Sequence, residues 1–525
     1  HFDGLIGTTF QNQSYEQIGG VIRNLIYMGG EYYKVLNAGT TNPESSGFIN
    51  EDALISYLGR INYSFNDKYY LTATIRRDGS SKFADGNRWG NFPSVSAAWR
   101  ISREEFFDIP WVSDLKIRAN YGTLGNSSIG RWIGYGGSFY GSSVYNVGNW
   151  DYMPLLNTSV INVLGRDQHL VNGATQVKLA NQDLKWETQT QTNFGADLAF
   201  LNNKLAVTAE YFISTTADVL TPMPILLSTG NDGGDPYANA AEIRNKGFEL
   251  SATWKENKND FNYSVTANFS TLKNEVLDLG YGKTEYITWM TKTELGEPIG
   301  MFYLRKTDGL FRSEQEVQNH KNSSGIVIQP NAKPGDIRYA DANDDGQIND
   351  ADRQIVGNPW PEFDLGLNFN LNYRSFDFSM MWYGAFGQDI YNGPRSTAER
   401  FDDNSNYLNF RSGHEPYQEN PNSDFPRILY GDDRNSRGDI DRWLEKGSYF
   451  KLRNLTLGYT LPKKLTERAK MSEFRVYLTG QNLLTLTKYR GLDPDFTAPD
   501  LWRRGHDEVR YPNARSVSVG LQFKF

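Results

Sequence analysis

Apolar and polar residues alternate in runs of roughly ten along most of this 525-residue chain. The final stretch shows this most clearly, with an apolar side chain at every second position: Val517, Val519, Leu521, Phe523 and Phe525. Strict alternation is typical of a strand that has one apolar face and one polar face. A run of about ten residues is the length of a tilted strand that crosses a bilayer. The pattern predicts an all-β chain that forms part of a transmembrane antiparallel β-barrel.

Similar runs recur up to the C-terminus, and we expect about fourteen strands in this sequence. Runs with clear alternation cover residues 69–76, 94–101, 115–121, 194–200, 205–211, 248–254, 263–269, 363–373, 376–386, 455–461, 474–478 and 516–525. The polar positions carry Arg, Lys, Asn and Thr, which suit a water-filled lumen, although the outer face of a soluble sandwich would look similar. Length favours the membrane, because most soluble strands run only about five or six residues.

The connections between these runs are alternately short and long. Short connections lie at 64–67, 201–204 and 256–259, and long ones at 126–183, 217–242, 277–298 and 392–447. Outer-membrane barrels have short periplasmic turns and long extracellular loops, whereas unstructured loops of this length are uncommon in compact soluble domains. The asymmetry therefore predicts that the long loops are extracellular.

Composition excludes several classes of protein. No apolar run approaches the ~18 residues of a membrane-spanning helix, and the absence of cysteine excludes disulfide scaffolds and thiol nucleophiles. A net charge of −8 with both signs interspersed argues against nucleic acid as a partner. The chain opens at His1 without a signal peptide, so we expect that a signal was cleaved or that an N-terminal part lies outside this chain.

One short motif has the spacing of a calcium loop. The segment from Asp341 to Asp352 fits the pattern D-x-N-x-D-G-x-I-x-x-x-D, with a glycine at position six for the sharp turn. We expect a structural Ca²⁺ site with these ligands: Asp341, Asn343, Asp345, the Gln347 carbonyl and Asp352. The alternative is a turn rich in Asp and Asn whose side chains bind only their own backbone N–H groups.

Aromatic residues are concentrated among the glycines and serines of segment 131–152. The candidates for ligand binding are Trp132, Tyr135, Tyr140 and Trp150. Aromatic faces stack on sugars and contact peptide side chains. The same rings can instead pack a long loop against its neighbours or against a lid.

Signatures of catalysis are missing from the sequence. The five histidines are isolated, and neither an H-E-x-x-H motif, a P-loop nor a G-x-S-x-G elbow occurs. Adjacent carboxylates such as Glu104 and Glu105 fit a solvated turn better than a glycosidase pair. We expect a protein that is not an enzyme.

Several segments resemble the barrel region of the SusC/RagA-type TonB-dependent outer-membrane transporters of Bacteroidetes. The segments that carry the resemblance are GRINY (59–63), LTATIRRDGSSKF (71–83), RWGNFPSVSAAWRIS (88–102), LKIRANYGTLGN (115–126), LKWETQTQTNFGADLAF (184–200), NKGFEL (245–250), YFKLRNLTLGYTLP (449–462) and TGQNLLTLTKYRGLDPD (479–495). They occur in the order of the family and extend over nearly the whole chain.

The resemblance implies a barrel of about 22 strands that is filled by an N-terminal plug and energised through TonB. It also implies import of oligosaccharides or oligopeptides, a SusD-like surface lipoprotein as a lid, and dimers of transporter–lid pairs. Neither a plug nor a TonB box is found in this sequence. Because a bilayer does not tolerate open sheet edges, we expect residues 1–525 to be the C-terminal portion of the barrel, with the plug and first strands outside this chain.

Two other functions stay open at this point. The first is a passive porin-type barrel without a lid. The second is a soluble, secreted, β-rich glycan-binding protein, which would dissolve without detergent. The sequence does not distinguish glycan from peptide cargo, because aromatic and amide-rich loops suit both.

Overall fold

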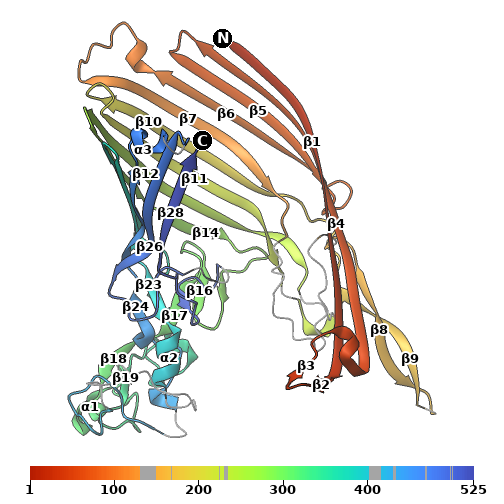
Figure 1. The fold of residues 1–525 in the computed structure, drawn as a ribbon. Coiled ribbons are helices and arrows are strands. Elements are labelled where there is room, and N and C mark those ends of the chain that lie inside the picture. Colours follow the sequence, from red (N-terminus) through yellow and green to blue (C-terminus); the bar gives the residue numbers. More distant parts are fainter. Residues whose placement is uncertain are drawn as a thin grey trace. The chain divides into compact units, whose positions relative to one another are not determined.

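The computed structural model describes residues 1–129, 149, 151–166, 168–223, 225–229, 235–400, 416–429, 433–467, 470–496, 498 and 501–525. Strands make up most of these residues (Figure 1). None of the helices in this part of the chain has the length and the apolar run needed to span a membrane.

Fifteen strands of the described residues form one large sheet. Its hydrogen-bonded order is β1 (Phe2–Leu25), β4 (Gly39–Phe65), β5 (Tyr69–Ser80), β6 (Trp89–Arg100), β7 (Val112–Asn126), β10 (Glu187–Phe200), β11 (Leu205–Pro222), β12 (Tyr237–Lys258), β13 (Phe261–Ser270), β21 (Phe363–Tyr373), β22 (Phe376–Phe386), β25 (Tyr449–Thr460), β26 (Glu473–Thr487) and β28 (Ser516–Lys524). The short strand β14 (Lys273–Asp278) pairs with β12. Successive strands of this order are neighbours and run antiparallel wherever a register is given, which is the up-and-down meander of a barrel wall.

Smaller sheets and short helices lie in the connections. The remaining strands are β2 (Tyr27–Met28), β3 (Glu31–Tyr32), β8 (Leu155–Leu164), β9 (His169–Lys178), β15 (Glu285–Ile287), β16 (Thr291–Glu294), β17 (Met301–Arg305), β18 (Thr307–Leu310), β19 (Ile337–Tyr339), β20 (Arg353–Gly357), β23 (Asp389–Asn392), β24 (Leu444–Lys446) and β27 (His506–Asp507). The helices are α1 (Glu314–Asn319), α2 (Gly393–Glu399) and α3 (Lys463–Thr466). Single 3₁₀ turns are η1 (Leu36–Ala38), η2 (Ile101–Arg103), η3 (Leu227–Thr229), η4 (Asp350–Asp352), η6 (Asp433–Asn435) and η7 (Asp441–Trp443).

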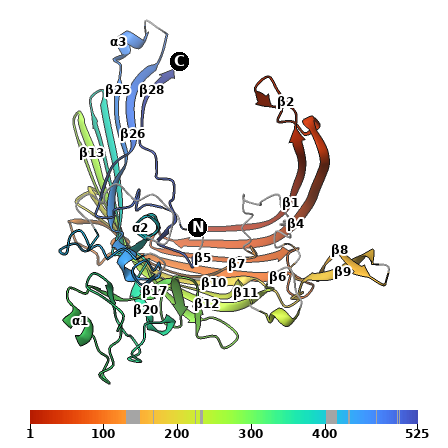
Figure 2. The ribbon, with the colours of Figure 1, turned by 90° about the horizontal axis from the view of Figure 1, so that it is seen from below.

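The chain forms two compact units. The first comprises 1–99, 118–193 and 214–243, and the second comprises 100–117, 194–213 and 244–525. In the second unit, the connections between β13 and β28 fold together, and α2 lies near β17 (Figures 1 and 2). Strand β23 pairs with β24 and packs against β17. The buried cluster of these connections includes Phe302, Leu304, Ile440 and Trp443. The apolar core of this unit therefore lies within the connections rather than on the large sheet.

The two faces of strand β5 are inverted relative to a soluble protein. The apolar side chains of Leu71 and Ile75 are 47% and 52% exposed, whereas Thr72 between them is half-buried. The Thr72 hydroxyl donates to Asn62 Oδ1 on β4 at 3.0 Å. A row of exposed apolar residues beside a hydrogen-bonded polar face is what a lipid-facing barrel wall requires.

Two of the three predicted short turns are confirmed. The chain reverses between Phe65 and Tyr69 and between Phe200 and Leu205. The third turn is displaced, because β12 continues to Lys258 and leaves only Asn259 and Asp260 as the link to β13. Asn259 has a φ of 54°, a conformation that Asn adopts more readily than most residues.

The predicted long connections differ more from the structure. The connection expected at 277–298 extends from the end of β13 to Phe363 and holds β14 to β20. The one expected at 126–183 contains the β8–β9 hairpin, and the one at 217–242 is shortened because β11 continues to Pro222 and β12 begins at Tyr237. The one expected at 392–447 contains α2 and β24. The first two long strands, β1 and most of β4, were not among the predicted strands.

Candidate functional site

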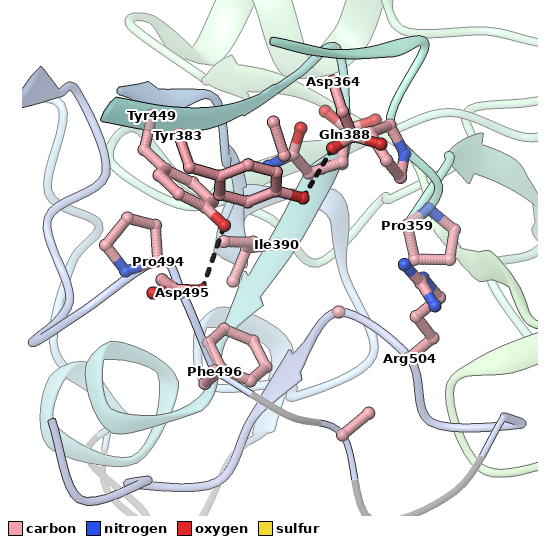
Figure 3. Close-up of a pocket in the computed structure, with 15 residues that line it drawn as sticks. Pro359, Asp364, Tyr383, Gln388, Ile390, Tyr449, Pro494, Asp495, Phe496 and Arg504 are labelled. Carbon is pink, nitrogen blue, oxygen red and sulfur yellow. Dashed lines mark hydrogen bonds between the residues drawn. The ribbon is translucent and has the colours of Figure 1, made fainter. Parts of the chain in front are cut away.

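A pocket of about 310 Å³ opens in the second unit, where β21, β22 and β25 meet the connections (Figure 3). Strand register builds its first wall, because Asp364 pairs with Ala385 and Ala385 pairs with Tyr449. Tyr383 lies two residues before Ala385 and therefore projects from the same face of β22. Residues far apart in the sequence complete the pocket, including Pro359, Gln388, Ile390, Asp495, Phe496 and Arg504.

The acidic wall around Asp495 is neutralised by the chain itself. Asp495 accepts a hydrogen bond from the Tyr449 hydroxyl at 3.0 Å (Figure 3) and forms ion pairs with Lys451 at 3.2 Å and with Arg453 at 2.8 Å. Lys451 is only 1% exposed, and its ammonium also binds Asp493 at 2.9 Å. These charges hold the wall together and leave Asp495 little capacity for a ligand.

Asp364 is placed differently. One of its carboxylate oxygens, Oδ1, accepts a hydrogen bond from the Tyr383 hydroxyl at 2.9 Å (Figure 3). Among the residues that the structure describes, no Lys or Arg forms an ion pair with Asp364. Its negative charge and its second oxygen therefore stay available to a group inside the pocket.

The guanidinium of Arg504 is the positive group of the pocket. It stacks on the ring of Trp360, with 4.2 Å between its central carbon and the ring centroid. Burial lowers the pKa of Arg504 overall, although the negative charge of Asp364 partly opposes this shift. No carboxylate of the described chain forms an ion pair with Arg504, so its hydrogen-bond donors can face a ligand.

Gln388 contributes a buried acceptor. The residue is 7% exposed, and its Nε2 donates to the Gly447 carbonyl at 2.8 Å. Its Oε1 has no hydrogen-bond partner within the described structure. Because a buried amide oxygen without a donor is costly, this atom indicates a place where a ligand N–H or O–H can bind.

These pocket residues were not predicted from the sequence. They come from five separate stretches between 359 and 505, and each stretch is unremarkable on its own. A signal was present in the segment GLDPD (491–495), which carried the family resemblance but to which no role was assigned.

The predicted calcium loop has the turn that its motif requires. Gly346 has a φ of 81°, and a Cβ at this position would lie 3.1 Å from Ile326. Asp341 accepts hydrogen bonds from the N–H groups of Asp345 and Gly346 at 3.2 and 2.8 Å. Asp352, which is fully buried, accepts from the Ala342 N–H at 2.9 Å.

These backbone contacts are those of the alternative interpretation, a self-bonded turn, but they leave room for a metal. Each carboxylate oxygen has two lone pairs, and a backbone N–H uses only one of them. Hydrogen bonds from the Asn343 amide and the Gln347 N–H lower the pKa of Asp345, which keeps it ionised as a cation ligand must be. Across the described residues, however, no group of three or more His, Cys, Asp or Glu side chains is gathered so that it could hold a metal.

The predicted aromatic ligand site falls outside the described residues. This holds for Trp132, Tyr135, Tyr140 and Trp150.

Comparison with known proteins identifies the family. Residues 2–483 match the family model described as "TonB dependent receptor-like, beta-barrel". This chain belongs to that family. The predicted transmembrane β-barrel class is thereby confirmed. Members of this family are outer-membrane proteins, which excludes the soluble glycan-binding alternative.

Named relatives confirm the SusC/RagA-type resemblance. The receptor is 32% identical over 519 residues to TonB-dependent receptor P3 of Formosa agariphila, covering 94% of this chain and 48% of the relative. It is 29% identical over 498 residues to TonB-dependent receptor SusC of Bacteroides thetaiotaomicron, covering 92% of this chain and 45% of that protein. The chain thus spans about half the length of the curated relatives it matches.

A solved structure shows the same fold. The structure of the RagAB peptide transporter superimposes with a TM-score of 0.77 at 24% identity, covering 100% of this chain and 53% of the chain compared.

Proposed function

We propose that this TonB-dependent receptor is the barrel part of an active importer of oligosaccharides or oligopeptides. The observation that best supports import is the arrangement of the two faces of β5. Its apolar residues point outward, and its hydrogen-bonded polar face points inward. Polar inner faces provide weak, repeated contacts along which a hydrophilic cargo can move. In this proposal TonB acts through an N-terminal plug outside this chain, and the protein has no catalytic activity of its own.

The pocket lies at the end of the strands that we assign to the extracellular side. The link between β21 and β22 is only two residues, because Tyr373 pairs with Phe376. Short turns of outer-membrane barrels face the periplasm. The opposite ends of these strands, where Asp364 and Ala385 line the pocket, would then face outward, where cargo arrives.

The test is uptake by cells that carry or lack the gene of the whole protein. Labelled oligopeptides and oligosaccharides are supplied separately, with and without functional TonB. We expect uptake of one class to require both the receptor and TonB. Uptake that depends on the receptor but persists without TonB would instead establish the passive porin-type alternative.

We also propose that a SusD-like surface lipoprotein covers the outer mouth, and that two transporter–lid pairs associate. Extraction of native membranes in mild detergent, followed by identification of the co-purifying chains, tests the partner and the size of the assembly. A receptor that purifies without any lipoprotein from cells that express both would contradict the proposal.

Calcium binding by the 341–352 loop is a separate prediction. We expect the purified, EDTA-treated protein to bind one Ca²⁺ in the loop with a Kd of about 10⁻⁴–10⁻³ M, as extracellular calcium modules do. The combined substitutions Asp341→Asn and Asp345→Asn should abolish this binding in isothermal titration calorimetry. The matched control is Asp344→Asn, because Asp344 lies in the same loop but accepts hydrogen bonds from Ser323. No calcium binding by the wild-type loop, or equal loss in the control, would leave the self-bonded turn as the correct interpretation.

A further inference from the structure

We propose that the pocket of Figure 3 binds the charged ends of a short peptide, with Arg504 contacting a carboxylate and Asp364 and Gln388 contacting an ammonium or N–H group. This inference rests on the proposed import function and narrows its cargo to peptides.

The first argument is the charge that the pocket leaves unpaired. Asp495 is neutralised by Lys451 and Arg453, and Asp389 is paired with Lys446 at 2.7 Å. Asp364 and Arg504 are the opposite charges that remain. Within the described chain they form no ion pair with each other, although Asp364 acts electrostatically on Arg504.

The second argument is the buried oxygen of Gln388. In Figure 3 the Gln388 side chain lies beside Asp364, and Arg504 lies apart from both, below Pro359. A donor group of the ligand can therefore meet Gln388 Oε1 and Asp364 together, while an acceptor group meets Arg504. Such a ligand carries a donor, preferably cationic, at one point and an anion at another.

Size and apolar lining limit how much of the ligand enters. A volume of about 310 Å³ is at the small end of the range for ligand pockets. Ile390, Phe496 and Pro359 supply apolar surface between the charged groups. The pocket therefore suits a very short peptide with both ends free.

A neutral glycan fits these groups less well. Its hydroxyls can bind the Gln388 oxygen, but they leave the partly buried charges of Asp364 and Arg504 without counter-charges. A dipolar peptide supplies both counter-charges, and hydrogen bonds between charged groups are about twice as strong as neutral ones.

The experiment measures binding to the purified full-length receptor in detergent, by isothermal titration calorimetry. The probes are the tripeptide Ala-Ala-Ala with free ends, its N-acetyl form, its C-terminal amide and the neutral trisaccharide maltotriose. The variants are Arg504→Gln and Asp364→Asn. The matched control is Arg374→Gln, which removes an exposed arginine of the β21–β22 turn that pairs with Asp260 in the β12–β13 link.

We expect the free tripeptide to bind the wild type, and Arg504→Gln to weaken it by about tenfold or more. The C-terminal amide lacks the carboxylate that Arg504 contacts, so it should bind the wild type more weakly than the free tripeptide does. Arg504→Gln should not weaken binding of this amide any further. Asp364→Asn should likewise weaken the free tripeptide but not the N-acetyl form. Arg374→Gln should bind every probe as the wild type does.

If capping one end of the tripeptide and substituting the residue proposed to contact that end weaken binding independently, so that their effects on the binding free energy add, the proposal is overturned. Absence of tripeptide binding at millimolar concentration would overturn it as well. Maltotriose binding that depends on Arg504 would overturn it in favour of a glycan site, while the import function would stand. Conversely, the expected tripeptide binding together with TonB-independent uptake would leave the peptide site intact and refute active import.

Discussion

An arginine in place of Ile75 is expected to destabilise the folded barrel by about 2–4 kcal/mol, because it would place a charge on the lipid face near the bilayer midplane. Ile75 is 52% exposed on the apolar face of β5. It lies six residues after the strand begins at Tyr69. At about 3.3 Å per residue and a tilt of about 40°, this is roughly 15 Å, or half of the hydrocarbon thickness.

The matched control is Thr72→Arg on the opposite face of the same strand. The new side chain would enter the polar interior, and the loss is limited to the hydrogen bond with Asn62, about 0.5–1.5 kcal/mol. Urea unfolding of the full-length protein in lipid vesicles, followed by tryptophan fluorescence, measures both variants. Equal destabilisation of the two would show that the faces of β5 are not lipid and lumen.

Replacement of Lys451 by Met should destabilise the protein by about 3–5 kcal/mol. Lys451 is 1% exposed, and its ammonium lies 2.9 Å from Asp493 and 3.2 Å from Asp495. Removal of this cation would leave two carboxylates close together beneath the pocket with too little positive charge. Lys446→Met is the control, because its side chain is 76% exposed and its pair with Asp389 is worth at most about 1 kcal/mol. A shift in the urea midpoint no larger than that of the control would contradict this role of Lys451.

The pH dependence of this variant has a definite sign. In the wild type, burial raises the pKa of Asp493, but hydrogen bonds, first among them that of Lys451, outweigh it and the pKa is lowered overall. Asp493 therefore stabilises the wild type at neutral pH, and this contribution is lost as the pH falls below the ordinary range of an aspartate. Without Lys451 the burial effect should dominate and raise the pKa of Asp493. The destabilisation should then decrease as the pH falls through that raised value, which urea unfolding between about pH 7 and 4 measures.

Alternation predicted the strands whose two faces contact different solvents. Strands β5, β21 and β28 were found because lipid selects every second residue along a run of about ten. Strand β4, with 27 residues, is much longer than a bilayer crossing requires. Strand β5 ends opposite Leu54, so residues 39–53 of β4 extend past it. No alternation between lipid and lumen is needed there, and most of β4 was not identified.

In the candidate sites, too, features set by a short stretch of sequence were predicted, whereas features built from distant stretches were not. The turn at Gly346 was predictable because the motif itself demands a left-handed residue at that position, and its φ is 81°. The pocket was not predictable, because Asp364, Gln388 and Arg504 become neighbours only through strand pairing and loop folding. Nothing in the local sequence around any of the three distinguishes it from an ordinary surface residue.

The self-neutralised wall of the pocket also has a consequence for how such receptors diverge. Asp495 is held by Lys451, Arg453 and Tyr449, so the scaffold keeps its stability whatever ligand the pocket receives. Arg504 stacks on Trp360 and Asp364 accepts a hydrogen bond from Tyr383, but within the described chain neither residue forms an ion pair. If the pocket binds the imported cargo as proposed, selection for a different cargo would exchange these two side chains while the wall beneath them stays the same. Among related receptors that import different substrates, we expect substitutions to be more frequent at these two positions than at Lys451.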